Sequence, residues 1–147
     1  MITRFEQFTS VISEIYRYVK KLEREEMIKY GLKGAFAEYL VAMNRYTDGI
    51  TAAKLCEICD RDKAAVSRIL CEMELHGLIV RQSGYRALVT LTKEGRKAAE
   101  FVLDRACIAV AKAGTGLNDE DRKVFYDTLA LISSNLQLIS KEGIPQT

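Results

Sequence analysis

The sequence predicts a mainly helical α+β protein built around a winged helix-turn-helix, and three observations support this fold class. Long amphipathic segments occupy both ends of the chain. Two short helical segments lie between them, separated by a turn. After Gly77 the pattern changes to two short runs rich in β-branched and aromatic residues, which is typical of strands. We expect one domain over residues 1–147, with a winged lobe at 35–92 and a helical lobe formed by 1–34 and 93–147.

Residues 4–28 are predicted to form the first helix, with a heptad-like apolar seam. The seam consists of Phe5, Phe8, Ile12, Ile15, Val19 and Leu22. One interpretation is a helix that belongs to the core of its own monomer. Because the stretch is short for a free coiled coil, we favour a helix that packs against both its own domain and a partner.

Capping residues and glycine bound the next three helices. A mostly apolar helix is expected at 35–46. Thr51 and Asp62 each carry a side-chain oxygen that can accept from a free amide of the first turn, so each predicts the start of a helix. The first of these helices should end at about Cys59. The second should end at Gly77, which can take the left-handed conformation that follows a helix.

The two strands of the wing are predicted at Leu78–Gln82 and Tyr85–Leu91. Ser83-Gly84 lies between them and suits a hairpin turn. Thr92 can cap a further helix that runs to about Ala113.

The last helix is predicted from Asn118 to about Ser140, with acidic residues in its first turn that complement the helix dipole. One apolar stripe contains Phe125, Leu129, Ile132, Leu136 and Ile139, and Val124, Leu131 and Leu138 mark another. A helix that is apolar on two sides needs two partners. Together with the first helix, this pattern predicts a homodimer whose interface uses both ends of the chain.

The helix within "DKAAVSRILCEMELHGLIV", residues 62–80, has one apolar face and one outward face. The apolar face contains Val66, Ile69, Leu70 and Met73, and the outward face contains Ala64, Ser67, Arg68, Cys71 and Leu75. The order of elements from 35 to 91 is that of a winged helix-turn-helix, a plan known mainly for binding DNA. A solvated amphipathic helix is the alternative when this helix is taken alone.

Five residues near the start of this helix are the predicted contacts in the major groove. Lys63 can reach a phosphate, and Arg68 can pair with a guanine edge or grip a phosphate. Ser67 can donate to either. The methyl groups of Ala64 or Ala65 can touch a thymine methyl.

Two motifs resemble the MarR family of bacterial transcriptional regulators over nearly the whole chain. They are "TAAKLCEICDRDKAAVSRILCEMELHGLIVR" and "VTLTKEGRKAAE". The resemblance implies a homodimer that binds a palindromic operator on double-stranded DNA, usually as a repressor, and a small-molecule effector site between the dimer helices and the DNA-binding lobe. The tip "RQSGYR" is shorter than the family's wing, which leaves Arg86 for the minor groove and Arg81 for the DNA backbone. Arg61 replaces a usually apolar residue.

Tyrosines and cysteines supply the other candidate sites. Tyr16, Tyr39 and Tyr46 lie near the expected effector site, although core packing is an alternative for most tyrosines. Cys71 is on the predicted DNA side, where oxidation would add bulk or charge; a tolerated surface thiol is the alternative.

The remaining cysteines are expected to pack in the core. Cys56 and Cys59 form a C-x-x-C on the apolar face of their helix, and a zinc site would need two further ligands. Cys107 lies among apolar residues. We therefore predict no metal and no cofactor.

Composition narrows the function classes. No Gly-rich phosphate loop, catalytic triad or metal cluster is recognisable, so an enzyme is not expected. The net charge of +2 is too even to prove a nucleic-acid partner, and a winged-helix module that binds protein without DNA is the alternative function. No signal segment or membrane-length apolar run is present, which predicts a cytoplasmic protein without a membrane partner and with reduced thiols.

Overall fold

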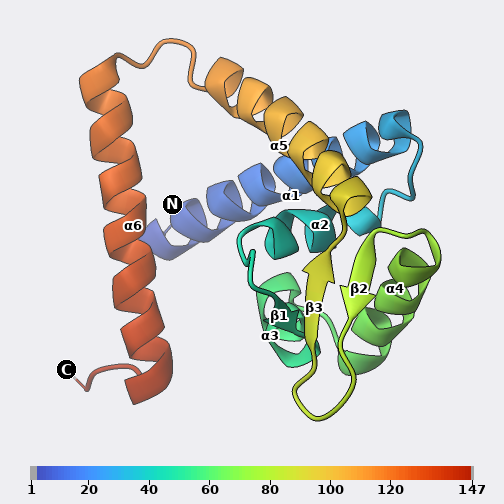
Figure 1. Ribbon diagram of the computed structural model, residues 1–147. Coiled ribbons are helices and arrows are strands. Elements are labelled where there is room, and N and C mark those ends of the chain that lie inside the picture. The colour runs from blue at the N-terminus through green and yellow to red at the C-terminus, as the bar shows by residue number, and fades with distance from the viewer. Residues whose placement is uncertain (1–2, 147) are drawn as a thin grey trace. The chain divides into compact units, whose positions relative to one another are not determined.

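The computed structural model describes residues 3–146, and its element order is that of a winged helix-turn-helix with long helices before and after it (Figure 1). In chain order the elements are α1 (Arg4–Tyr30), α2 (Phe36–Asn44), β1 (Ile50–Thr51), α3 (Ala52–Cys59), α4 (Lys63–Leu75), β2 (Ile79–Arg81), β3 (Leu88–Leu91), α5 (Lys93–Ala113) and α6 (Asp119–Glu142). The predicted fold class is therefore confirmed.

Side-chain caps start the helices where the sequence predicts them. Thr51, Thr92 and Asn118 each accept a hydrogen bond from the backbone amide three residues on, at 3.2, 3.1 and 2.8 Å. Each bond satisfies one of the amides that have no partner within the helix. These local interactions explain why the observed starts of α3, α5 and α6 match the predicted ones.

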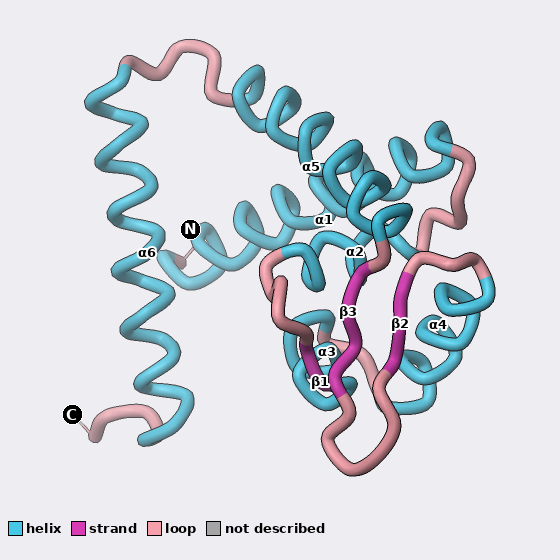
Figure 2. Tube along the Cα trace, viewed as in Figure 1, coloured by secondary structure: helices cyan, strands magenta, loops and turns pink. Residues whose placement is uncertain are grey.

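The sheet has three strands, so the prediction of a two-stranded wing was incomplete. β3 lies in the centre and pairs antiparallel with β1 on one side and with β2 on the other (Figure 2). Val89 of β3 is opposite Ile50 in one ladder and opposite Arg81 in the other. β1 has only two residues, too few for the alternating pattern by which a strand is recognised in a sequence.

The wing loop is longer than the predicted two-residue turn at Ser83-Gly84. The β2–β3 ladder ends at Arg81, and one further bond joins the Gln82 amide to the Leu88 carbonyl at 3.0 Å. Residues 83–87 therefore form a loop instead of continuing the second strand, which shortens that strand at its N-terminal end.

The core of the winged lobe is built around α2, most of whose residues are buried. Its largest fully buried side chains are Phe36, Tyr39, Leu40 and Met43 of α2 together with Met27, Leu55, Val66, Leu70, Met73 and Val102. These residues come from α1, α2, α3, α4 and α5, so one apolar cluster joins all five helices.

The chain divides into two compact units, one ending at Ile108 and the other beginning at Ala109 within α5. α6 belongs to the second unit and has no buried residue. No helix in the described part of the chain is both long enough and apolar enough to span a membrane.

Gly95, in the first turn of α5, is where α5 passes closest to the chain entering β2. A Cβ added to Gly95 would lie 2.0 Å from the carbonyl oxygen of Leu78. We expect Gly95→Ala to lower the free energy of unfolding by about 3 kcal/mol or more, because backbone must move to relieve the overlap. Urea unfolding followed by circular dichroism measures this change.

Gly114→Ala is the matched control. A Cβ there meets only the guanidinium end of Arg122, at 3.1 Å, and that flexible side chain can move away. Equal stability of Gly95→Ala and the wild-type protein would contradict the close approach of α5 to Leu78.

Candidate nucleic-acid interface

α4 is attached to the lobe by its buried face and by a cap at its start. Val66, Leu70 and Met73 are buried in the core. Asp62 Oδ1 accepts a hydrogen bond of 2.7 Å from the Ala65 amide, as the sequence predicts. The opposite face of the helix is therefore left exposed to solvent in one chain.

Two ion pairs hold the ends of α4 to the segments around α2. Lys33, just before α2, lies 2.9 Å from a carboxylate oxygen of Glu72 on α4. Arg61, just before the cap of α4, pairs with Glu38 of α2 at 3.1 Å. The hydrogen bonds with Glu38 raise the pKa of Arg61, which stays charged. These pairs link residues far apart in the chain, and sequence spacing does not predict them.

The outer strip of α4, defined here as Lys63, Ala64, Ser67 and Arg68, is exposed along its whole length. Neither Lys63 nor Arg68 has an ion-pair partner among residues 3–146. Two cationic groups, a hydroxyl and a methyl thus share one accessible helix face. Ala65, also predicted as a contact, is half-buried.

The wing places its two predicted arginines in different environments. Arg86 is exposed on the loop, in the left-handed conformation with φ of 53°, and its guanidinium carbon lies 5.5 Å from the centre of the Tyr85 ring. Arg81 is half-buried and pairs with Glu74 of α4 at 3.4 Å. A phosphate contact by Arg81 would therefore compete with Glu74.

Cys71 has a cationic neighbour that the sequence did not reveal. An Arg81 nitrogen, Nη2, donates to Cys71 Sγ at 3.2 Å. The two residues are ten positions apart, and β2 brings Arg81 alongside α4. The exposed thiol therefore lies beside a guanidinium that also contacts Glu74.

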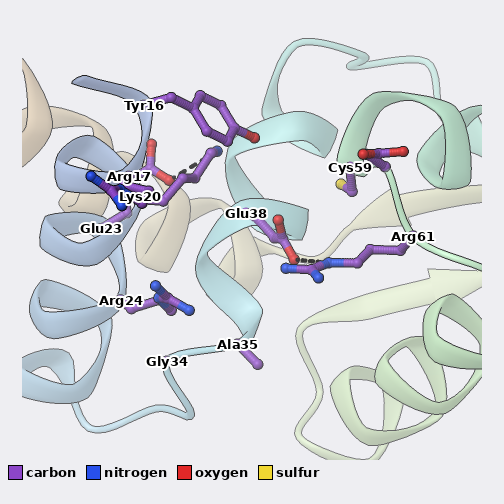
Figure 3. A pocket seen from close by; sticks show the side chains of 11 residues that line it. Tyr16, Arg17, Lys20, Glu23, Arg24, Gly34, Ala35, Glu38, Cys59 and Arg61 are labelled. Atoms are coloured by element: carbon purple, nitrogen blue, oxygen red, sulfur yellow. Dashed lines mark hydrogen bonds and ion pairs between the residues drawn. The ribbon is translucent and has the colours of Figure 1, made fainter. Parts of the chain in front are cut away.

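A cavity of about 340 Å³ lies between α1, the start of α2 and the turn between α3 and α4 (Figure 3). We call it the α1–α2 cavity. It is lined by Tyr16, Arg17, Lys20, Glu23, Arg24, Gly34, Ala35, Glu38, Cys59, Asp60 and Arg61.

The three tyrosines predicted near an effector site do not share this cavity. Tyr16 lines it, whereas Tyr39 is buried in the core and Tyr46 lines a separate, much smaller hollow beyond the other end of α2. Tyr39 faces the core because α2 is apolar on nearly all sides. The wall of the α1–α2 cavity consists mainly of charged residues, which the sequence analysis did not single out.

The other cysteines lie in two environments. Cys59 is buried and Cys56 half-buried, in agreement with the predicted core packing. Burial raises the pKa of the Cys59 thiol to about 11, so the thiol is neutral at physiological pH. Cys107 is exposed, and its predicted core position was wrong because it lies off the buried stripe of α5 that ends at Val102. The described residues contain no cluster of three or more His, Cys, Asp or Glu suited to a metal ion.

Comparisons with known proteins identify the fold. No family model matches the sequence. A curated relative, an uncharacterized HTH-type transcriptional regulator of Bacillus cereus, is 24% identical over 128 residues, which are 86% of this chain and 84% of the relative. A MarR transcriptional regulator of Methanosarcina mazei superposes with a TM-score of 0.79 and 23% identity, covering 91% of this chain and 92% of that one.

A MarR-family structure from Listeria monocytogenes, complexed with a 26-mer DNA, superposes with a TM-score of 0.76. Its identity is 22%, and the match covers 95% of this chain and 97% of that one. The protein has the MarR fold.

Within the MarR fold, the two motifs noted in the sequence have clear structural roles. Residues 62–68 cap and form the first turns of α4, including the outer strip. Residues 89–95 include most of β3, the Thr92 cap and the close approach of Gly95 to Leu78. The motifs thus correspond to the exposed helix face and to the junction that supports it.

Proposed function

We propose that this protein is a sequence-specific DNA-binding transcriptional regulator, a homodimer that represses from a palindromic operator. The observation that carries the proposal is the outer strip of α4, exposed on a helix fixed to the core by its other face. A helix of this kind fits the major groove, and Arg68 has the donors to read a guanine edge. The structural similarity to a MarR-family protein complexed with DNA supports the same reading.

Selection of bound fragments from a random DNA pool tests this function directly. We expect enrichment of a two-fold symmetric site with half-sites about one helical turn apart. Retention of the selected site should fall as salt rises, because phosphate contacts release counterions. Failure to enrich any sequence would count against specific DNA binding.

Exposed apolar faces support the homodimer. In a single chain, the α1 seam residues Phe5, Phe8, Ile12, Ile15 and Leu22 are exposed, and so are Val124, Phe125, Leu131, Leu136 and Leu138 of α6. Soluble monomers rarely leave contiguous apolar faces of this length uncovered. A second copy with the same faces would bury both and would present two α4 helices to a symmetric operator.

Two features support regulation of DNA binding. The α1–α2 cavity borders Arg61, the residue that precedes the Asp62 cap of α4, so an effector held there can act on the start of α4. Cys71 lies on the same helix as the outer strip, beside Arg81. Oxidation of this thiol would add polar bulk between α4 and β2.

A winged-helix module that binds protein is the second candidate. Leu75 and Tyr85 are strongly exposed on the winged lobe, and the net charge is only +2. Such a module would show no salt-dependent retention of DNA, so the salt titration distinguishes the two functions.

Arg68→Ala should weaken binding to the selected site by about 1–3 kcal/mol and relax the preference at one base pair per half-site. Fluorescence anisotropy with labelled DNA measures the affinity. Lys21→Ala, which removes an exposed cation on α1, is the control and should bind as the wild-type protein does. Wild-type affinity of the Arg68 variant would show that this side chain does not contact DNA.

Ile15→Glu should convert the dimer into a monomer, because it places a charge in the α1 seam that a partner would bury. Size-exclusion chromatography with light scattering gives the mass. Ser10→Glu changes an exposed residue on the opposite side of α1 and should stay dimeric. A dimeric Ile15 variant at the same protein concentration would mean that the seam is not the interface.

Hydrogen peroxide should weaken DNA binding of the wild-type protein but not of Cys71→Ser, since serine lacks the oxidisable sulfur. Gel shifts before and after peroxide treatment measure the effect. Unchanged binding by peroxide-treated wild-type protein would exclude regulation through this thiol.

A further inference from the structure

The α1–α2 cavity has a cationic side formed by α1. Arg17, Lys20 and Arg24 follow one another at spacings of three and four residues, so they lie on one face of the helix (Figure 3). Lys20 pairs with Glu23 at 3.2 Å. Within residues 3–146, Arg17 and Arg24 form no ion pair, so both guanidinium groups have donors available to a ligand.

The acidic groups of the cavity do not cancel this charge. Glu23 is engaged by Lys20, and Glu38 by Arg61 from the opposite wall. Asp60 is the one lining acid without an ion pair in the described chain, against the two arginines of α1. The unpaired side chains therefore leave an excess of one positive charge, and a ligand with a negative group would complement it.

The backbone at the cavity adds to the same preference. Gly34 and Ala35 line it where α2 begins, and no side chain caps this helix start. The amide end of a helix carries partial positive charge and favours an anion nearby.

The remaining wall suits a small organic body. The Tyr16 ring contributes an aromatic surface, and the Cys59 thiol contributes a small neutral one. A volume of about 340 Å³ is at the lower end of the range for small-molecule sites. A compact molecule with one charged group matches this combination.

We propose that the α1–α2 cavity binds a small organic anion, whose negative group pairs with Arg17 and Arg24. The bound anion also competes with Glu38 for Arg61. Because Arg61 immediately precedes the Asp62 cap, this competition alters the turn that starts α4. The binding part of this inference stands alone, whereas its effect on DNA rests on the proposed function.

Titration calorimetry without DNA tests the binding part on the full-length protein. The probes are benzoate, inorganic phosphate and benzamide, the last having the shape of benzoate without its charge. Arg17→Gln and Arg24→Gln should each weaken anion binding about tenfold or more, through loss of a charge-assisted hydrogen bond. Lys21→Gln removes a cation that faces away from the cavity and should leave binding unchanged.

Each result decides the binding part. Binding of benzoate alone supports a carboxylate ligand, binding of phosphate alone supports a phosphate ester, and sensitivity to both arginine variants supports the site. No binding of either anion overturns the proposal. Equal binding of benzamide and benzoate also overturns it, as does equal weakening by the Lys21 variant.

The regulatory part is tested by anisotropy on the selected DNA with and without the anion that binds. We expect the anion to lower DNA affinity in the wild-type protein and to have at least tenfold less effect in Arg24→Gln. Anion binding that leaves DNA affinity unchanged overturns the regulatory part alone. A protein that binds the anion but no DNA at all refutes the proposed function and leaves the anion site standing.

Discussion

The burial of α2 is the constraint on which the rest of the structure depends. Phe36, Tyr39, Leu40 and Met43 extend from this helix into the surrounding helices, so α1, α3, α4 and α5 are positioned by contact with one element. Interiors packed at this density transmit displacement poorly by compression and well by rigid movement. A change at the start of α2 therefore reaches α4 without any change in the core itself.

Polar contacts refine what the apolar core positions. The Lys33–Glu72 and Arg61–Glu38 pairs connect α4 to the two ends of the segment that includes the start of α2. Both pairs are partly exposed, so each contributes little to stability. Their value is geometric, since they select one arrangement of the helix face among several that the core would tolerate.

Local chemistry explains why much of the fold could be predicted from the sequence. Caps such as Thr51, Asp62 and Asn118 act within three residues, and the apolar face of α4 is readable from its own spacing. β1 was missed because two residues carry no period. The outer strip required only the helix itself to be recognised.

The parts of the site that could not be predicted depend on contacts between distant segments. The Cys71–Arg81 contact exists because β2 folds back along α4, and the charged wall of the α1–α2 cavity combines three regions of the chain. Tyr39 and Tyr46 were grouped by their nearness in sequence, although burial and helix length separate them. No helical period records such relations.

The uncovered apolar faces of α1 and α6 have a consequence for the protein's abundance. When assembly buries a large share of the apolar surface, part of the folding free energy comes from the second copy and depends on mass action. Dilution then loosens each chain as well as separating the pair. A cell that makes too little of this protein would hold copies that are less well folded and more readily degraded, so synthesis rate and lifetime would rise and fall together.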